Sequence, residues 1–147
     1  MKFVSFLLKG QPKFGISDGN NITDLTGKIK GAQTLKELIS NKSLQEAKDF
    51  SKKNPGKINH DEIEYLPVIP NPGKIVCVGL NYSEHVKETG RTVEQNPVIF
   101  LRVPESQTAH KQPIQRPKVS ESLDYECEMA VILSLIHISE PTRPSVI

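Results

Sequence analysis

The chain has 147 residues, which is enough for one ordinary domain with a hydrophobic core. Its formal net charge is only +2 and its lysines are scattered, which argues against a nucleic-acid-binding protein. No apolar run approaches the roughly 18 residues of a membrane span, and the two cysteines have neither disulfide nor zinc spacing. We therefore expect a protein of the reducing cytoplasm that binds neither nucleic acid nor membrane.

The first part of the chain carries strand signals and, between them, helix signals. Short apolar or alternating runs predict strands at residues 2–8, 12–16, 22–25 and 63–66. Two capping-box patterns, Thr34 with Glu37 and Ser43 with Glu46, predict two helices before the last of these strands. The Asn-Pro-Gly sequence at residues 54–56 ends the second helix.

Three prolines at positions 67, 70 and 72 form a stiff connector after the fourth strand. We place a domain boundary there, between a small N-terminal domain at residues 1–70 and a second region at residues 71–132. In that second region we expect a strand at 74–80 covered on both faces and a helix at 83–88, capped by Ser83 and stopped by Gly90. We also expect strands at 97–101 and 125–132. The predicted fold class is therefore α+β and β-rich.

Two glutamates lie on one face of the predicted strand at 125–132. Glu126 and Glu128 are two residues apart, so their side chains point the same way. Ala130 and Ile132 continue that face, and two carboxylates in an apolar row are costly unless they are paired or bind a cation. Magnesium, manganese and calcium prefer oxygen ligands. The spacing permits a metal site, although a solvated pair of glutamates is the commoner outcome of such spacing.

A second candidate group is a histidine with an acidic neighbour. His85 and Glu88 are three residues apart and share one face of the predicted helix. A carboxylate beside an imidazole raises its basicity and orients it, as a general base requires. An ordinary surface contact is the alternative. Arg102 follows a strand and either binds a carboxylate or is a surface arginine. His60 and His110 lie among polar loop residues, their spacing suggests no partner, and we expect both to be surface histidines.

The order of these signals resembles the fumarylacetoacetate hydrolase family. A Gly-x-Asn-Tyr-x-x-His-x-x-Glu element of that family is matched by residues 79–88. Its Phe-x-Lys segment is matched by residues 100–102, with Arg102 in place of lysine, which keeps the charge but not the geometry. Its Asp-Tyr-Glu-x-Glu-Leu strand is matched by residues 124–129, with Met129 in place of leucine.

The resemblance implies the start of a mixed β-sandwich roll, commonly dimeric, that holds a divalent cation. Glu126 and Glu128 match two ligands of the cation, which would be Mg²⁺, or Mn²⁺ or Ca²⁺. His85 and Glu88 match the pair that orients and deprotonates water, and Arg102 falls in a substrate-binding segment. The implied partners are a small keto-acid substrate and, in a homodimer, a second copy of the chain.

The implied activity is metal-dependent hydrolysis of a C–C bond in a small keto acid, such as an acylpyruvate or fumarylacetoacetate. Ureidoglycolate lyase, hydroxy-diene-dioate isomerase, hydratase and oxaloacetate decarboxylase reactions fit the same scaffold, because an enolate is common to them. A non-catalytic binding protein or fragment is the alternative from another class. The presence of both candidate groups argues against it.

Residues 133–147 depart from the family pattern. Residues 133–143 resemble the translation of a transposase adapter used in sequencing libraries, which predicts a non-native tail. The tail would replace a downstream segment that includes a third metal ligand, an aspartate. A natural short isoform is the alternative. On the first interpretation the full-length parent is the enzyme and this fragment is inactive.

Overall fold

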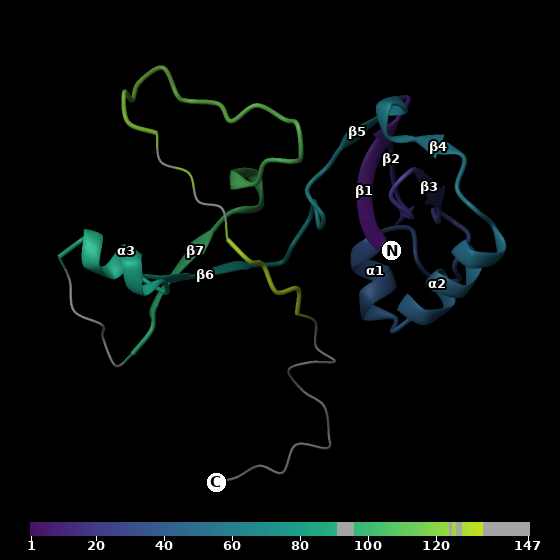
Figure 1. Ribbon diagram of the computed structural model, residues 1–147, viewed down its shortest axis with the longest axis horizontal. Helices are drawn as coiled ribbons and strands as arrows, with labels where there is room; N and C mark the ends of the chain where they lie inside the picture. The colour runs from purple at the N-terminus through teal and green to yellow at the C-terminus, as the bar shows by residue number, and fades with distance from the viewer. Residues whose placement is uncertain (91–95, 124, 126–127, 134–147) are drawn as a thin grey trace, which may run out of the picture. The chain divides into compact units, whose positions relative to one another are not determined.

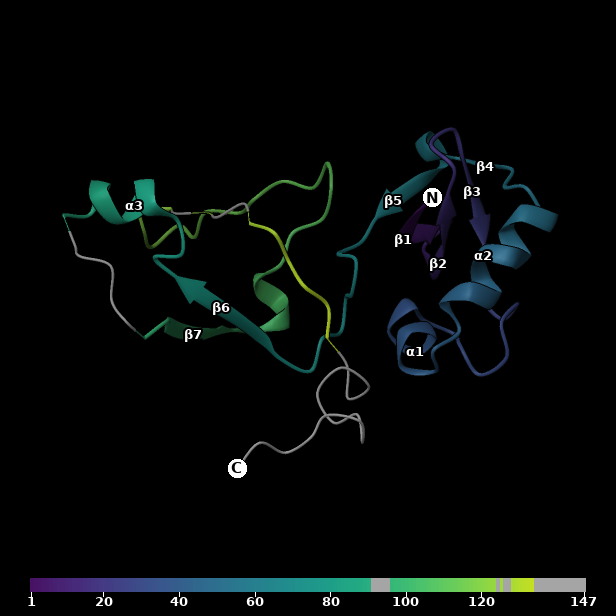
Figure 2. The same cartoon turned by 60° about the horizontal axis from the view of Figure 1, so that its bottom comes forward.

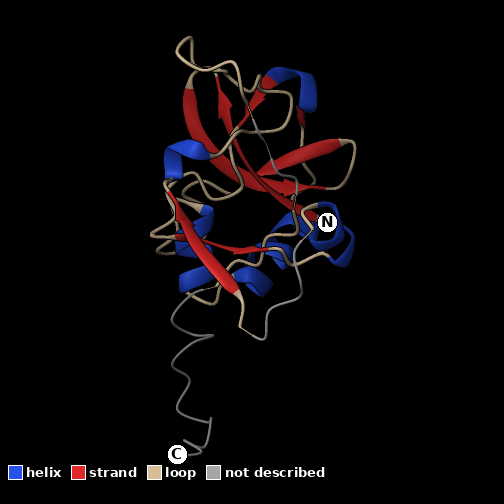
Figure 3. Cartoon of the chain, turned by 90° about the vertical axis from the view of Figure 1, so that its left-hand side faces the viewer, coloured by secondary structure: helices blue, strands red, loops and turns tan. Residues whose placement is uncertain are grey.

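The computed structural model describes residues 1–90, 96–123, 125 and 128–133 of the chain (Figure 1). Strands dominate and the helices are short, so the predicted α+β, β-rich class is confirmed (Figure 3). The chain forms two compact units, one made of Met1–Ile69 with the chain from Thr108 onward, the other of Pro70–Gln107. No helix among the described residues is both long enough and apolar enough to cross a membrane.

The first unit is built on an antiparallel sheet with the strand order β4-β3-β2-β1-β5. The strands are β1 (Lys2–Leu8), β2 (Gln11–Ser17), β3 (Asn21–Asp24), β4 (Ile58–Asn59) and β5 (Ile63–Tyr65), with a 3₁₀ turn at His60–Glu62. Lys9 and Gly10 both have positive φ angles, 52° and 76°, as a tight hairpin turn between β1 and β2 requires. The four predicted strands of this region are confirmed, and β4 is an addition to them.

Two helices, α1 (Leu35–Ser40) and α2 (Leu44–Lys53), complete the first unit (Figure 2). The capping box at α1 is confirmed: the Glu37 amide donates to the Thr34 hydroxyl at 3.2 Å, and the Thr34 amide donates to the Glu37 carboxylate at 3.1 Å. The second predicted capping box is wrong. Ser43 has φ −91° and ψ 18°, not the extended backbone of a capping residue, and its side chain caps no amide of α2.

The hydrophobic core of this unit lies between the sheet and the helices. It is formed by buried apolar residues of β2, of the loop after β3, of both helices and of the connector: Phe14, Ile16, Leu25, Ile29, Ala32, Leu35, Leu38, Ala47 and Ile69. Burial of apolar side chains stabilises a fold by about 25 cal/mol for each Å² removed from water. The first unit therefore holds most of the buried apolar surface of the described chain.

Gly56 lies against the backbone of β3. A Cβ atom at this position would overlap main-chain atoms of Ile22 and Thr23, which cannot move aside as a flexible side chain could. We expect Gly56→Ala to lower the free energy of unfolding of the first unit by about 2 kcal/mol or more, because strand β3 must shift. Chemical denaturation of the purified chain measures the effect.

The control for this substitution is Gly73→Ala, because a Cβ atom at Gly73 would meet nothing within 4 Å. That variant should stay within about 0.5 kcal/mol of the wild type. Equal stability of the two alanine variants would contradict the close packing of Gly56 on β3.

The second unit contains a two-stranded antiparallel sheet and one short helix. They are β6 (Ile75–Gly79), α3 (Ser83–Glu88) and β7 (Val98–Arg102), with a 3₁₀ turn at Pro104–Ser106 after β7. The predicted strands at 74–80 and 97–101 are confirmed, but the expectation that the first is covered on both faces is wrong. Val76 is 56% exposed and its cross-strand partner Leu101 is 68% exposed, because no further described strand or helix packs on that face.

The strand predicted at 125–132 is not found in the part of it that the structure describes. Residues 125 and 128–133 have no regular secondary structure and are exposed. A strand is stable only when its backbone groups pair with a neighbour, and no described strand pairs with this segment. Residues 124, 126 and 127 of the predicted strand lie outside the described residues.

Candidate functional site

The short helix α3 carries the two candidate catalytic side chains. Val86, which is only 4% exposed, is its buried residue and anchors it. The helix ends at Glu88, and Gly90, two residues further on, has a left-handed φ of 67° and an amide that donates to the Lys87 carbonyl at 3.0 Å. The predicted C-terminal stop is therefore confirmed. The predicted cap is not: Tyr82 occupies the capping position with extended backbone, and Ser83 is already the first helical residue.

The structure brings His85 and Glu88 together. The Nδ1 atom of His85 and the Oε2 atom of Glu88 are 3.7 Å apart, which is an ion-pair distance when the imidazole is protonated. Lys87 is bound instead by Glu84 at 3.2 Å, so its ammonium does not compete for Glu88. The side chains of His85 and Glu88 are 55% and 77% exposed, so both are open to water and to a small ligand.

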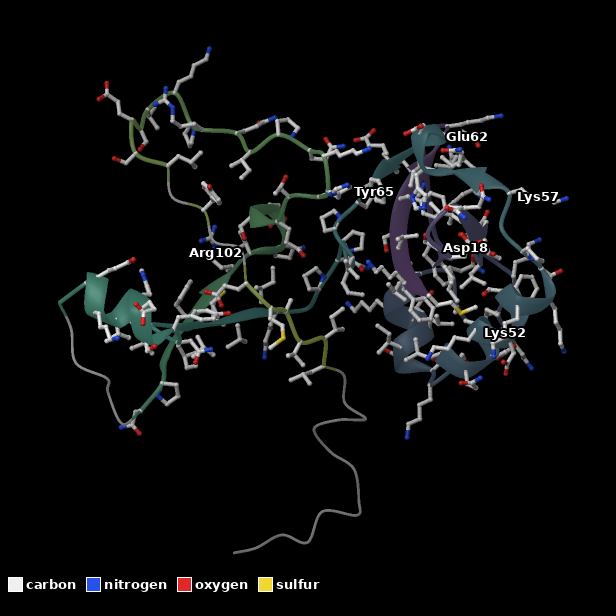
Figure 4. The ribbon with its side chains drawn as sticks, viewed as in Figure 1. Asp18, Lys52, Lys57, Glu62, Tyr65 and Arg102 are labelled. Atoms are coloured by element: carbon white, nitrogen blue, oxygen red, sulfur yellow. The ribbon has the colours of Figure 1, made fainter. Side chains whose placement is uncertain are left out.

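Arg102 lies at the far end of the two-stranded sheet from the turn that leads into α3. It pairs with Ile75, the first residue of β6, whereas Val98 pairs with Gly79 at the end from which the chain enters that turn. Arg102 follows Val98 by four positions along β7, which corresponds to roughly 13 Å at about 3.3 Å per residue. The exposed side chain of Arg102 is labelled in Figure 4. The structure does not place Arg102 beside the His85–Glu88 pair.

Of the two predicted metal ligands, the structure describes Glu128 alone. Glu128 is exposed and lies in irregular backbone of the first unit, while Glu126 lies outside the described residues. Within the part of the chain that the structure describes, no three histidine, cysteine or acidic side chains are grouped as a metal site would require. The assignment of Glu126 and Glu128 stays a prediction.

The prediction of a surface histidine is confirmed for His110, which is exposed, whereas His60 is half-buried, and both have neighbours that their spacing does not suggest. His60 joins three elements of the first unit: its Nε2 atom is 3.0 Å from the Ser17 hydroxyl on β2, and its Nδ1 atom is 2.5 Å from the Tyr65 hydroxyl on β5. His110 packs edge-on against the ring of Tyr65, with centroids 5.0 Å apart. Tyr65 is labelled in Figure 4. Ser17 lies 43 residues before His60, and Tyr65 is likewise far from His110 in sequence, so spacing could not reveal these two contacts.

Comparisons with known proteins match both the motif region and the N-terminal region. Residues 74–142 match the model of a family described as fumarylacetoacetate (FAA) hydrolase C-terminal. The mitochondrial oxaloacetate tautomerase fahd2 of Xenopus laevis is 32% identical over 140 residues, which cover 90% of this chain and 44% of the relative. The matched range of the family model includes residues 133–142, so the predicted non-native tail stays a prediction.

Two further relatives match a shorter part of the chain. The mitochondrial oxaloacetate tautomerase Fahd2a of Rattus norvegicus is 36% identical over 52% of this chain and 24% of its own length. The uncharacterized protein MJ1656 of Methanocaldococcus jannaschii is 40% identical over 42% of this chain and 26% of its own length. The chain spans less than half the length of these curated relatives.

The ordered motifs and these matches define a class of enzymes rather than a class of binding modules. Residues 74–142 are therefore similar to the fumarylacetoacetate hydrolase family, and the relative from Xenopus laevis extends the similarity to 90% of the chain.

Proposed function

We propose that the protein acts on a small keto acid, with His85 as the group that takes and returns a proton and Glu88 as the group that orients it. The contact of 3.7 Å between the two side chains is the observation that carries the proposal. A general base must reach the proton that it removes, and the exposure of His85 leaves room for a substrate or a water molecule beside the imidazole. Glu88 favours the imidazolium that forms after proton transfer.

The proposal includes a divalent cation that Glu126 and Glu128 would bind. The donor chemistry fits, since carboxylate oxygens are the ligands that Mg²⁺, Mn²⁺ and Ca²⁺ prefer. When bound, such a cation supplies Lewis-acid polarisation and a template for the oxygens of the keto acid. Glu128 is exposed and is therefore open to the cation from solvent.

The relatives favour proton transfer between carbon and oxygen as the reaction to test first. Two of them are named as oxaloacetate tautomerases, and the one from Xenopus laevis matches 90% of this chain. In tautomerisation of an enol to its keto form, the enol oxygen loses a proton and the neighbouring carbon gains one. His85 is suited to carry out either transfer.

Hydrolysis of a C–C bond in an acylpyruvate is the second candidate, because the same pair can deprotonate water. Hydroxide then adds to the distal carbonyl, the C–C bond breaks, and the departing enolate of pyruvate takes up a proton. The reaction consumes one water molecule and forms a carboxylic acid and pyruvate. Decarboxylase, lyase, isomerase and hydratase reactions on this scaffold are further outcomes of the same test.

The deciding experiment supplies the complete product of the gene with Mg²⁺ and either enol oxaloacetate or an acylpyruvate. Loss of the enol absorbance without pyruvate release identifies a tautomerase. Release of a carboxylic acid and pyruvate from the acylpyruvate identifies a hydrolase, and CO₂ release from oxaloacetate identifies a decarboxylase. Absence of turnover on all of these keto acids, in a folded protein that binds Mg²⁺, would overturn the proposal.

Metal binding is expected to depend on both glutamates. Glu126→Ala should weaken Mg²⁺ or Mn²⁺ binding severely, by an order of magnitude or more, because one charged oxygen ligand is lost. Isothermal titration calorimetry of the complete gene product measures the affinity. Glu121→Ala, an exposed glutamate of the same segment, is the control and should bind like the wild type. Unchanged affinity in Glu126→Ala would remove this site.

The cytoplasmic location and the homodimer stay part of the proposal. Cys77 is a free thiol, which suits a reducing compartment. The mitochondrial relatives make the mitochondrion the location to compare, and fluorescent fusions of the complete gene product would distinguish it from the cytoplasm. Sedimentation of the same protein would report its oligomeric state.

A further inference from the structure

The chain enters the helix of the candidate site through a residue with left-handed backbone. Leu80 lies in the turn between β6 and α3 and has a φ of 55°. In that region the Cβ atom of an L residue crowds the backbone, so a branched apolar residue is uncommon there. The other non-glycine residues with positive φ are all lysines: Lys9, Lys42 and Lys111.

The elements on both sides of Leu80 are fixed. Gly79 is the last residue of β6 and pairs with Val98 of β7. Val86 is buried at 4% exposure and holds α3 in place. Only Asn81 and Tyr82 stand between Leu80 and the first residue of the helix. The direction in which α3 leaves the sheet is therefore set within three residues, and Leu80 is the one whose backbone departs from the ordinary regions.

His85 follows Leu80 by five residues and lies in the first turn of α3. A change of φ at Leu80 would rotate the start of the helix and would carry His85 with it. The side chain of Leu80 is half-buried. A leucine thus holds a conformation that glycine and asparagine adopt more easily, and it is this backbone conformation that sets where α3 begins.

We propose that Leu80 is a positioning residue, whose left-handed backbone sets the orientation of the His85–Glu88 pair relative to the substrate. The inference rests on the proposed function of that pair. It makes a specific claim about the backbone: residues that tolerate a left-handed conformation should replace Leu80, and β-branched residues should not.

Three variants separate a backbone role from a side-chain role. Leu80→Asn keeps nearly the shape of leucine and tolerates positive φ, and Leu80→Gly adopts it freely. Leu80→Val resists it, because a β-branched side chain makes the left-handed region a strong outlier. If the backbone conformation matters, asparagine and glycine should behave alike and valine should differ. If the apolar contacts of the leucine side chain matter instead, all three variants should lose activity, because none of them restores those contacts.

The test has one structural and one kinetic measurement. In the 147-residue chain, nuclear Overhauser effects should show a short distance from the amide proton to Hα at Leu80 and a contact between His85 and Glu88. The short amide-to-Hα distance should persist in Leu80→Asn and should lengthen in Leu80→Val, while the His85–Glu88 contact within α3 should persist in both variants. In the complete gene product, Leu80→Val should lower kcat at least ten-fold with KM and melting temperature little changed, and Leu80→Asn should restore kcat.

The outcomes distinguish the inference from the function on which it rests. A wild-type protein without keto-acid turnover would overturn the proposed function, while the nuclear Overhauser effects would still decide whether residue 80 holds the left-handed backbone in the wild type and its variants. A long amide-to-Hα distance at Leu80, an equally short distance in Leu80→Val, or equal kcat in the valine and asparagine variants would each overturn the positioning role.

Discussion

Replacing His85 with alanine should lower kcat of the complete gene product on its keto acid by roughly two orders of magnitude or more, because general-base catalysis typically contributes this much. Glu88→Ala should lower it as well, since the imidazole loses the carboxylate 3.7 Å from its Nδ1 atom. Affinity for Mg²⁺ should hardly change in either variant, because neither residue is assigned as a ligand. Steady-state kinetics and calorimetry measure the two effects separately.

The same helix offers a matched control. Glu84 has the same side chain as Glu88 and lies on α3, but it binds Lys87 at 3.2 Å and not His85. Glu84→Ala should therefore keep kcat close to that of the wild type. Full activity in His85→Ala with metal dependence retained would contradict the general-base role and would favour a decarboxylase mechanism that needs no base at this position.

The second large effect concerns the stability of the first unit in the 147-residue chain. Limited proteolysis should cut first after Ile69 and should leave a resistant fragment of about residues 1–69. Apart from Val86, all the buried hydrophobic residues of the described chain belong to this fragment, whereas apolar side chains of the second unit such as Val76 and Leu101 are exposed. Mass mapping of the fragments would locate the cuts.

Phe14→Ala should abolish that resistance. Phe14 is 1% exposed in the core, and truncating a buried phenylalanine costs about 3–5 kcal/mol. The cost is close to the whole stability of a small domain, about 5 kcal/mol at the lower end. Val119→Ala is the control, because Val119 is 96% exposed. Persistence of the fragment in Phe14→Ala, or early cuts within residues 1–69 of the wild type, would contradict this distribution of stability.

Local signals in the sequence predicted the parts of the fold that local interactions determine. The capping box of Thr34 and Glu37 involves residues three apart, so its bonds could be foreseen. Ser43 and Glu46 have the same spacing, but the short connection from α1 gives Ser43 a backbone that cannot cap. A spacing rule cannot detect that difference, because the preceding helix decides it.

Features that depend on contacts between residues far apart in the sequence could not be predicted in this way. The run at 125–132 has the composition of a strand, yet its described residues have no partner strand and are irregular. His60 contacts Ser17, 43 residues earlier, and no periodicity links the two. The contact between His85 and Glu88 was foreseeable from helical spacing, whereas the left-handed backbone at Leu80 was not, since leucine ordinarily avoids it.

The measurement that most directly tests the role of His85 is enzyme-dependent uptake of deuterium from D₂O into the carbon next to the keto group. Tautomerisation and acylpyruvate hydrolysis both end with protonation of that carbon, so the readout does not depend on which reaction operates. With Mg²⁺ present, the complete gene product should accelerate uptake well above the spontaneous rate, and His85→Ala should lose about a hundred-fold or more of that acceleration. Equal acceleration in the wild type and in His85→Ala, with both proteins folded and metal-bound, would contradict proton transfer by this pair.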